Sequence, residues 1–263
     1  MLSILSVPLD ENSSFIKGCA KAPIAIIKAF RSESSNMFSE NGFNCGDDKQ
    51  ISVLDNLELK SGKVAIEQIK NAVEDELKNG KKVISIGGDH SITYPIIEAY
   101  SNNFESLNIL HFDAHPDIYD NFDNNPYSHA SPFARIMENS LVKRLVQVGI
   151  RTFNNHQKEQ VQKYGVEVIE MKDFSSNLSL KFEGPVYISL DIDGLDPAYA
   201  PGVSHPEPGG LSTRNLINII NQLEGEVVGG DIVEYNPNKD VNDITAFTAA
   251  KLLKEMIGKI MNS

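Results

Sequence analysis

Carboxylate and imidazole side chains follow two apolar runs of this chain at intervals of two residues. The runs are Leu107–Phe112 and Val186–Leu190. The polar residues after them are Asp113, His115 and Asp117 for the first run, and Asp191 and Asp193 for the second. Alternate side chains of a strand point to the same face, so we expect Asp113 to point with His115. Carboxylate oxygens mixed with imidazole are typical of divalent metal sites. The pattern therefore predicts a metalloenzyme.

Two further segments end apolar runs in the same way. Gly87–Ser91 contains His90 after a pair of glycines, which we expect to allow a sharp turn, and Gly229–Glu234 ends in a carboxylate. Each segment alone has a structural interpretation: a hydrogen-bonded histidine, a tight turn, or an aspartate that caps a helix. Burying so many acceptors at one edge would be very costly without a cation. The combination therefore favours a metal site.

The candidate ligands are His90, Asp113, His115, Asp117, Asp191 and Asp193. Six ligands exceed the four of a closed tetrahedral zinc site. Two ions that share carboxylates use them better, and a set rich in oxygen favours manganese or magnesium. Such a pair of ions activates water, so the predicted reaction class is metal-assisted hydrolysis.

Apolar runs alternate with amphipathic stretches along the whole chain. The predicted strands are Leu2–Val7, Ile51–Leu54 (the weakest), Lys82–Ile86, Leu107–Phe112, Leu145–Ile150, Val166–Glu170, Val186–Leu190 and Val227–Val233. The predicted helices are Pro23–Phe30, Ser61–Asn79, Pro95–Tyr100, Pro132–Glu138, His156–Tyr164, Ser212–Gln222 and Ile244–Ile260. This alternation predicts a mainly parallel sheet covered on both faces, in one α/β domain over residues 1–263.

Some local signals refine this prediction. Ser61 is a plausible N-cap and Gly80 a plausible end for the helix between them. The polar stretches Ser32–Lys49 and Ser175–Glu183 are expected to be surface loops. In folds of this class, ligands bind beyond the carboxyl ends of the strands, which is where the metal motifs lie.

The composition excludes several classes of function. The net charge of -12 argues against nucleic-acid binding and favours a cationic substrate, although solubility alone would also explain it. Two cysteines, Cys19 and Cys45, do not make a disulfide framework, so we expect reduced thiols and a cytoplasmic protein. The apolar start Met1–Val7 lacks a basic segment and is expected to be a buried strand and not a signal peptide, and no apolar run is long enough to cross a membrane.

Four motifs together resemble the ureohydrolase (arginase/agmatinase) family. The motifs are GGDHS at Gly87–Ser91, DAHxD at Asp113–Asp117, SxDxDxxDP at Ser189–Pro197, and the late acidic residue Glu234. They occur in the family's order and cover nearly the whole chain. Further segments are most similar to plant-type arginases, namely Pro116–Tyr119, Tyr127–Ser131, Phe133–Glu138 and Ala200–Gly210.

The resemblance implies a three-layer α/β/α sandwich and two Mn²⁺ ions per subunit, although other divalent ions would also fit the ligands. It implies that one ion is held by His90, Asp113, Asp117 and Asp191, and the other by Asp113, His115, Asp191 and Asp193. Asp113 and Asp191 would then bridge the ions. The resemblance also implies a homo-oligomer, a trimer or a hexamer.

The family's catalytic residues carry over to His129 and Glu234, beside the metal ligand Asp117. His129 matches the proton-shuttle histidine, which protonates the departing amine, a role that suits imidazole. Glu234 matches the carboxylate that receives the guanidinium group in two parallel hydrogen bonds. The alternatives are that His129 caps the helix near Ser131 and that Glu234 only orients a metal ligand.

The substrate implied by the resemblance is a small guanidino compound that is cleaved to urea and an amine. L-Arginine, giving ornithine, ranks first, agmatine second and another guanidino compound third. Asn125, Ser128 and Arg151 are the candidates for binding the far end of the substrate, and Arg151 has the alternative of an internal ion pair. Two other classes stay open: a zinc-dependent amide deacetylase, and a silent oligomer stabilised by metal.

Overall fold

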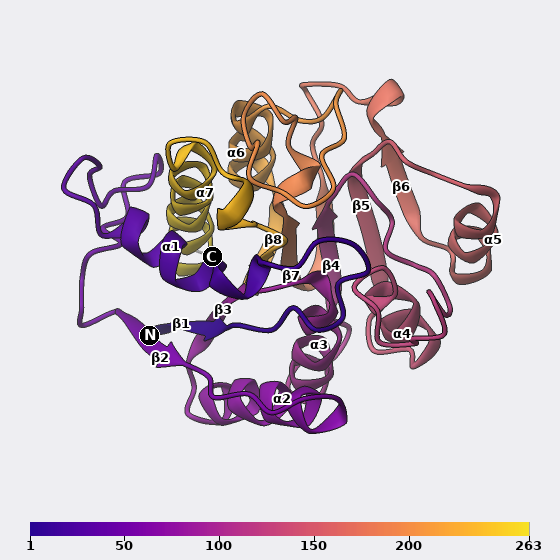
Figure 1. Ribbon diagram of the computed structural model, residues 1–263. Helices are drawn as coiled ribbons and strands as arrows, with labels where there is room; N and C mark the ends of the chain where they lie inside the picture. Colours follow the sequence, from indigo (N-terminus) through magenta and orange to yellow (C-terminus); the bar gives the residue numbers. More distant parts are fainter. Residues whose placement is uncertain (263) are drawn as a thin grey trace.

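Eight strands form a single sheet in which every pair among the described residues is parallel (Figure 1). The computed structural model describes residues 1–262. The strands are β1 (Leu2–Val7), β2 (Ile51–Asn56), β3 (Lys82–Gly87), β4 (Asn108–Phe112), β5 (Arg144–Ile150), β6 (Glu167–Glu170), β7 (Lys181–Asp191) and β8 (Glu224–Val233). Their order in the sheet is β2-β1-β3-β8-β7-β4-β5-β6. The predicted fold class is therefore confirmed.

Helices cover both faces of the sheet and make the three layers. One layer consists of α1 (Ala22–Phe30), α6 (Thr213–Gln222) and α7 (Ile244–Met261). The other consists of α2 (Lys63–Lys78), α3 (Thr93–Ser101) and α4 (Pro132–Glu138), with α5 (Asn155–Tyr164) beside α4. Figure 1 shows α1, α6 and α7 on one side of the strands and α2 and α3 on the other. Among residues 1–262, no helix is both long enough and apolar enough to cross a membrane.

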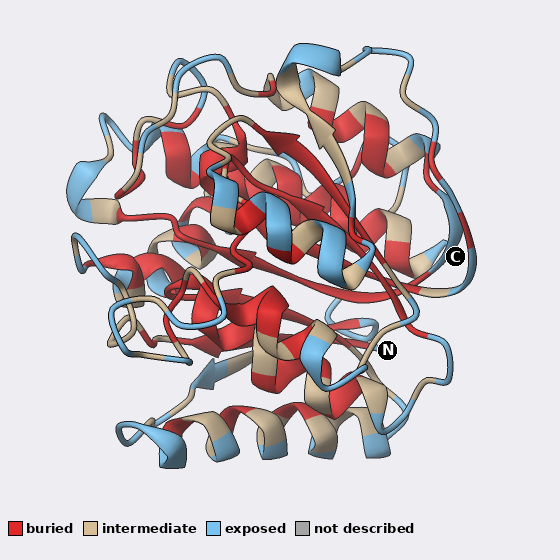
Figure 2. Cartoon of the chain, turned by 90° about the vertical axis from the view of Figure 1, so that its right-hand side faces the viewer, coloured by how far each residue is buried: buried red, intermediate tan, exposed pale blue. Residues whose placement is uncertain are grey.

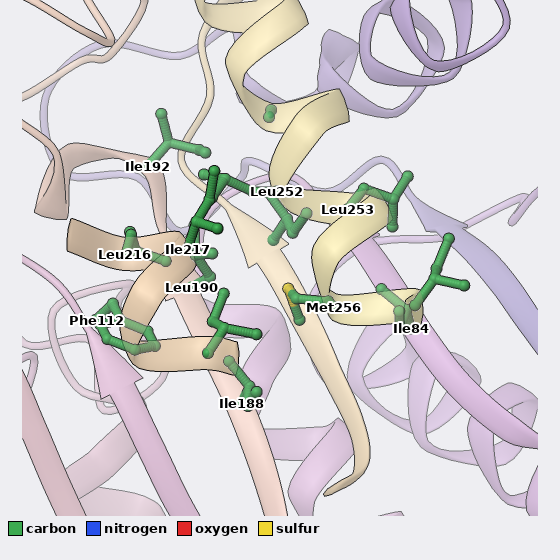
Figure 3. Close-up of a cluster of buried hydrophobic side chains, with 14 of the residues drawn as sticks. Ile84, Phe112, Ile188, Leu190, Ile192, Leu216, Ile217, Leu252, Leu253 and Met256 are labelled. Carbon is green, nitrogen blue, oxygen red and sulfur yellow. The ribbon is translucent and has the colours of Figure 1, made fainter. Parts of the chain in front are cut away.

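Two hydrophobic clusters, one on each face, hold the layers together. In the first, Leu252 and Met256 of α7 meet Ile188 and Leu190 of β7 beneath α6 (Figure 3). In the second, the amphipathic helix α2 buries Ala65, Ile69 and Val73 and exposes its opposite face, visible as the striped helix at the bottom of Figure 2. Burial of this kind is the main stabilising contribution to a fold.

Two predicted details are wrong. The helix predicted from Ser61 is instead preceded by Gly62, whose φ of 61° puts it in the left-handed region, and no side chain caps that end. The stretch expected to be a surface loop at Ser175–Glu183 contains the start of β7, because Leu180 and Phe182 are buried in the first cluster. Leu180 and Phe182 are only two apolar residues within a mostly polar stretch, which is too short a pattern to predict a strand.

The strands that carry the predicted motifs are the four central neighbours β3, β8, β7 and β4. Since all are parallel, their carboxyl ends share one edge. Gly87, the last residue of β3, and Gly88 do not have a positive φ. Gly88 is needed because the backbone packs closely here: a Cβ on it would lie 1.6 Å from the carbonyl oxygen of Leu9. The backbone N–H groups of Gly88 and Asp89 donate to Val7 and Leu9, which holds the loop after β1 against the site.

Candidate active site

Six carboxylate and imidazole side chains meet at the carboxyl edge of the sheet. They are the predicted set of His90, Asp113, His115, Asp117, Asp191 and Asp193. Strand alternation is not what brings them together, because β4 ends at Phe112 and Asp113 and His115 lie in the loop beyond it. After β7 a short 3₁₀ turn follows, in which the backbone N–H of Asp193 donates to Asp191 Oδ1 at 2.8 Å.

The first group of potential ligands surrounds His90. Its Nδ1 atom lies 3.3 Å from Asp113 Oδ2, 3.0 Å from Asp117 Oδ2 and 3.1 Å from Asp191 Oδ2. This nitrogen is buried, and in the described chain it makes no hydrogen bond of acceptable geometry. The four donor atoms all lie within 4.8 Å of one another. Donors that converge without bonding to each other fit a cation at their centre.

A second group shares Asp113 with the first. His115 Nδ1 lies 3.4 Å from Asp113 Oδ1 and 3.2 Å from Asp193 Oδ2. Two groups joined through one carboxylate fit a pair of ions. Asp191 belongs to the first group only in this arrangement, so its predicted bridging role stays a prediction.

The electrostatics of the cluster also favour a cation. Burial, together with the charges of Asp193 and Asp113, raises the pKa of Asp191 well above its usual value. Burial likewise raises the pKa of Asp193 to about 6, against the opposing effect of His115. Crowded buried carboxylates disfavour one another's charged forms. Divalent ions would compensate these charges.

A chain of hydrogen bonds orients His90 from behind. Its Nε2 lies 3.0 Å from Ser189 Oγ, and that hydroxyl donates to Asp231 Oδ1 at 2.8 Å. Asp231 also accepts from Thr93 Oγ1 and Tyr187 Oη. Because the Ser189 hydroxyl donates to a carboxylate, it accepts from His90 Nε2–H, and Nδ1 is then the ring nitrogen that faces the carboxylates. Asp231 was not among the site residues predicted from the sequence.

His111 orients Asp113 in a similar way. Its Nε2 lies 2.8 Å from Asp113 Oδ2, and its Nδ1 lies 3.1 Å from the amide nitrogen of Gln147. The amide group donates, so Nδ1 accepts and Nε2–H donates to Asp113. His111 was not among the predicted site residues, although a histidine inside the apolar run Leu107–Phe112 was a usable signal.

His129 and Glu234 form a buried pair beside the cluster. His129 Nδ1 lies 2.8 Å from Glu234 Oε1, and the backbone N–H of His90 donates to the same oxygen at 2.9 Å. Burial opposes the charge on His129, but Glu234 raises the pKa of the imidazole to about 9. His129 Nε2 lies 2.8 Å from the hydroxyl of Ser14. The helix cap expected as the alternative for His129 is not formed, because no side chain caps α4.

A cavity of about 310 Å³ opens onto these residues. Besides metal ligands and the His129–Glu234 pair, it is lined by Ser14, Tyr119, Phe122, Ala130, Thr152, Phe153, Asn154, Gln157, His205 and Glu207. Of these, Tyr119 and Ala130 belong to the segments Pro116–Tyr119 and Tyr127–Ser131, which carried part of the resemblance. His205 and Glu207 belong to the segment Ala200–Gly210, which carried part of the resemblance. Ser14 gave no signal, because its role depends on how the loop after β1 folds back.

The three residues predicted to bind the far end of the substrate do not line this cavity. The Asn125 amide donates to Asn12 and accepts from the backbone of Tyr127, while the buried Ser128 hydroxyl accepts from the backbone of Ala130. The guanidinium of Arg151 donates to backbone carbonyls and forms neither the expected clamp nor an ion pair with a side chain in residues 1–262. Those carbonyls belong to Gly149, Asp193, Gly194, Leu195 and Glu207.

Known proteins resemble this chain over nearly its full length. The model of the Arginase family matches residues 1–258. A mitochondrial arginase of Medicago truncatula is 46% identical over 276 residues, covering 98% of this chain and 81% of that protein. A solved arginase structure from Medicago truncatula superposes with a TM-score of 0.93 at 44% identity, covering 98% of this chain and 87% of that one. An N(1)-aminopropylagmatine ureohydrolase of Thermus thermophilus is 35% identical over 267 residues, covering 97% of this chain and 88% of that protein.

Proposed function

This chain belongs to the arginase family, and from that premise we propose that it is a metal-dependent hydrolase that cleaves L-arginine to ornithine and urea. The observation that carries the proposal is the buried Glu234 carboxylate, paired with His129 and opening onto the same cavity as the six-residue cluster. A guanidinium group needs such a carboxylate as partner, and its hydrolysis needs the cluster beside it.

The cluster would hold two manganese ions. His90, Asp113, Asp117 and Asp191 would hold one ion, and Asp113, His115, Asp191 and Asp193 the other. Four carboxylates and two imidazoles suit a hard divalent ion better than a soft ion that prefers thiolate ligands. When bound, the ions supply Lewis acidity and favour the formation of a nucleophile from water at neutral pH.

Glu234 would receive the guanidinium group and set its distance from the cluster. Its own position is well defined, because Oε1 accepts from His129 and from the backbone of His90. Its φ of 64° is unusual for a non-glycine residue, and strain of this kind is typical of functional sites. Oε2 has the thiol of Cys19 at 3.6 Å as a weak donor, so this oxygen keeps acceptor capacity for a substrate.

His129 would carry the proton to the departing amine. The Glu234 carboxylate favours the protonated imidazole, and Ser14 holds the far nitrogen of the ring. A charged imidazole at the rim of a cavity is a suitable general acid for an amine leaving group.

Agmatine is the second candidate substrate. In its favour, no lysine or arginine of the described chain lines the cavity to receive the carboxylate of arginine. The similarity to an N(1)-aminopropylagmatine ureohydrolase points the same way. A homo-oligomer (trimer or hexamer), a single functional domain and a cytoplasmic location complete the proposal. The oligomer rests on the resemblance to the family, and the domain and the location rest on the sequence pattern and composition.

The test is urea release from arginine and from agmatine, measured side by side with protein reconstituted with Mn²⁺. Faster turnover of arginine supports the proposal, and faster turnover of agmatine replaces the substrate while keeping the chemistry. Urea from neither substrate, with one bound zinc per chain by elemental analysis, would favour the amide deacetylase instead. Two bound ions without turnover of any guanidino compound would favour the silent oligomer.

A further inference from the structure

Glu207 is a carboxylate in the cavity that the proposed chemistry does not use. The cavity is lined by five carboxylate side chains, of which Asp117, Asp191 and Asp193 are metal-ligand candidates and Glu234 pairs with His129. Within residues 1–262, the Glu207 carboxylate forms no hydrogen bond or ion pair with the protein. It is partly exposed whereas Glu234 is only 4% exposed, so Glu207 lies nearer the solvent.

The backbone around Glu207 is fixed to the metal-ligand loop by Arg151. Both Nε and Nη2 of this guanidinium donate to the carbonyl oxygen of Glu207, at 2.9 and 2.5 Å, and Nη2 also donates to the carbonyl of Asp193 at 2.7 Å. The arrangement requires Gly210, where a Cβ would lie 2.7 Å from Arg151 Nη2. A bidentate charged donor holds an acceptor in one orientation.

A second set of bonds fixes the end of the same loop. The carboxylate of Asp196 accepts from the backbone N–H groups of Gly209 and Gly210, at 2.6 and 3.1 Å. Pro206 and Pro208 flank Glu207 and restrict its backbone further. Because the loop is already ordered, binding a ligand at Glu207 does not cost the conformational entropy of ordering this loop.

The charges of the cavity define what Glu207 would bind. The four aspartates of the metal-ligand cluster, three of which line the cavity, match two divalent ions, and Glu234 matches one guanidinium group. Glu207 then remains, with no lysine or arginine of residues 1–262 lining the cavity to neutralise it. We propose that Glu207 is the specificity residue that binds the ammonium group at the tail of the guanidino substrate.

This inference rests on the proposed function and narrows the substrate class. It favours guanidino compounds whose tail carries an amine, as in arginine and agmatine, over those whose tail carries only a carboxylate. The protein offers only polar, uncharged side chains for any other group at the tail of the substrate, because Tyr119, Asn154 and Gln157 line the same cavity.

The experiment compares four guanidino compounds of similar length that carry different charged groups at the tail. They are agmatine with an ammonium group, butylguanidine with none, 4-guanidinobutanoate with a carboxylate, and arginine with both. In Glu207→Gln, reconstituted with Mn²⁺, the KM for agmatine should rise about tenfold, as expected for the loss of one charged hydrogen bond. The KM for butylguanidine should stay unchanged, and the KM for 4-guanidinobutanoate should fall.

The matched control is Glu226→Gln, which makes the same charge change at an exposed position near the beginning of β8. It should leave all four KM values unchanged. Equal shifts for all four substrates in Glu207→Gln, or no shift for agmatine, would overturn the inference.

A calorimetric titration separates this inference from the proposed function. Agmatine binding to the Mn²⁺-loaded protein is measured for wild type and Glu207→Gln, whether or not urea is released. Agmatine binding that weakens in the variant, while wild type releases urea from neither agmatine nor arginine, would support the role of Glu207 and refute the hydrolase proposal. Binding that is equal in both proteins would refute the role of Glu207 alone.

Discussion

Replacing Ser189 with alanine removes the acceptor for the Nε2–H group of His90. The His90 side chain is fully buried, and within residues 1–262 only the Ser189 hydroxyl lies within hydrogen-bonding distance of Nε2. Without that acceptor, the buried Nε2–H group is left unsatisfied and the ring loses the contact that fixes its orientation. Nδ1 lies 3.0–3.3 Å from the three carboxylate oxygens that complete this ligand group, so the orientation of the ring decides whether all four atoms can bind one ion. Metal affinity should therefore fall.

Two independent estimates give the size of this effect. A buried donor left without its acceptor costs about 1–3 kcal/mol. Loss of an outer-shell partner of a metal-binding histidine typically lowers affinity by about 10–100-fold, and this corresponds to about 1.4–2.7 kcal/mol. The estimates overlap, so we expect a loss of about 10–100-fold for the ion that His90 holds.

Isothermal titration of the metal-free protein with Mn²⁺ measures both binding events. Only one of them should weaken in Ser189→Ala, because the ligand group of Asp113, His115 and Asp193 does not contain His90. The control is Thr93→Val, which also removes a hydroxyl that donates to Asp231 but keeps the hydrogen bond between Ser189 and the His90 side chain. Our reasoning is refuted if Ser189→Ala binds both ions like wild type, or if Thr93→Val weakens metal binding as strongly.

Further predictions concern catalysis, pH and stability. His129→Asn should lower kcat about a hundredfold or more with both metal ions retained by elemental analysis, and a wild-type kcat would contradict its role as general acid. Glu234→Gln should raise KM about tenfold or more, and an unchanged KM would contradict guanidinium binding. In the metal-free protein, Glu234 raises the pKa of His129 to about 9 and His129 lowers the pKa of Glu234 to about 2, so their pairing stabilises the fold fully between about pH 4.5 and 6.5 and is lost as the pH rises from there through 9. The difference in unfolding free energy between wild type and Glu234→Gln should therefore shrink over this range, and a constant difference would count against the pairing. Leu252→Ala should cost about 2–5 kcal/mol in denaturant unfolding, whereas Val64→Ala, at a side chain that is 50% exposed, should cost less than about 0.5 kcal/mol.

The metal-ligand set was predictable because it did not depend on the order of the strands. In a parallel sheet all carboxyl ends lie at one edge, so His90, Asp113 and Asp191 were expected to approach one another wherever their strands stood. What the sequence did not contain was the position of β8 between β3 and β7, which puts Glu234 beside the cluster. The pairing of β8 with β3 joins residues more than a hundred positions apart, and no local pattern encodes it.

The cavity wall was much harder to predict, because loops form it. Ser14 reaches His129 only because the loop after β1 packs against Gly88. Asn125 and Arg151 were expected to face the substrate, yet nearby backbone and amide groups satisfy their polar atoms. Residue type indicates what a side chain is able to bind, but the neighbours that compete for it depend on the tertiary structure.

The place of β8 in the sheet has a consequence for how the molecule assembles. Without β8 the sheet consists of two separate pieces, β2-β1-β3 and β7-β4-β5-β6, each built from strands near one another in sequence. His90 follows β3 in the first piece, whereas Asp113 and Asp191 lie at the ends of β4 and β7 in the second. A nascent chain that has not yet produced residues 224–233 therefore holds the two halves of its ligand set apart. Closure waits for a late, long-range pairing, the slow kind of folding step. Metal capture should thus mark the completion of the fold and not its beginning.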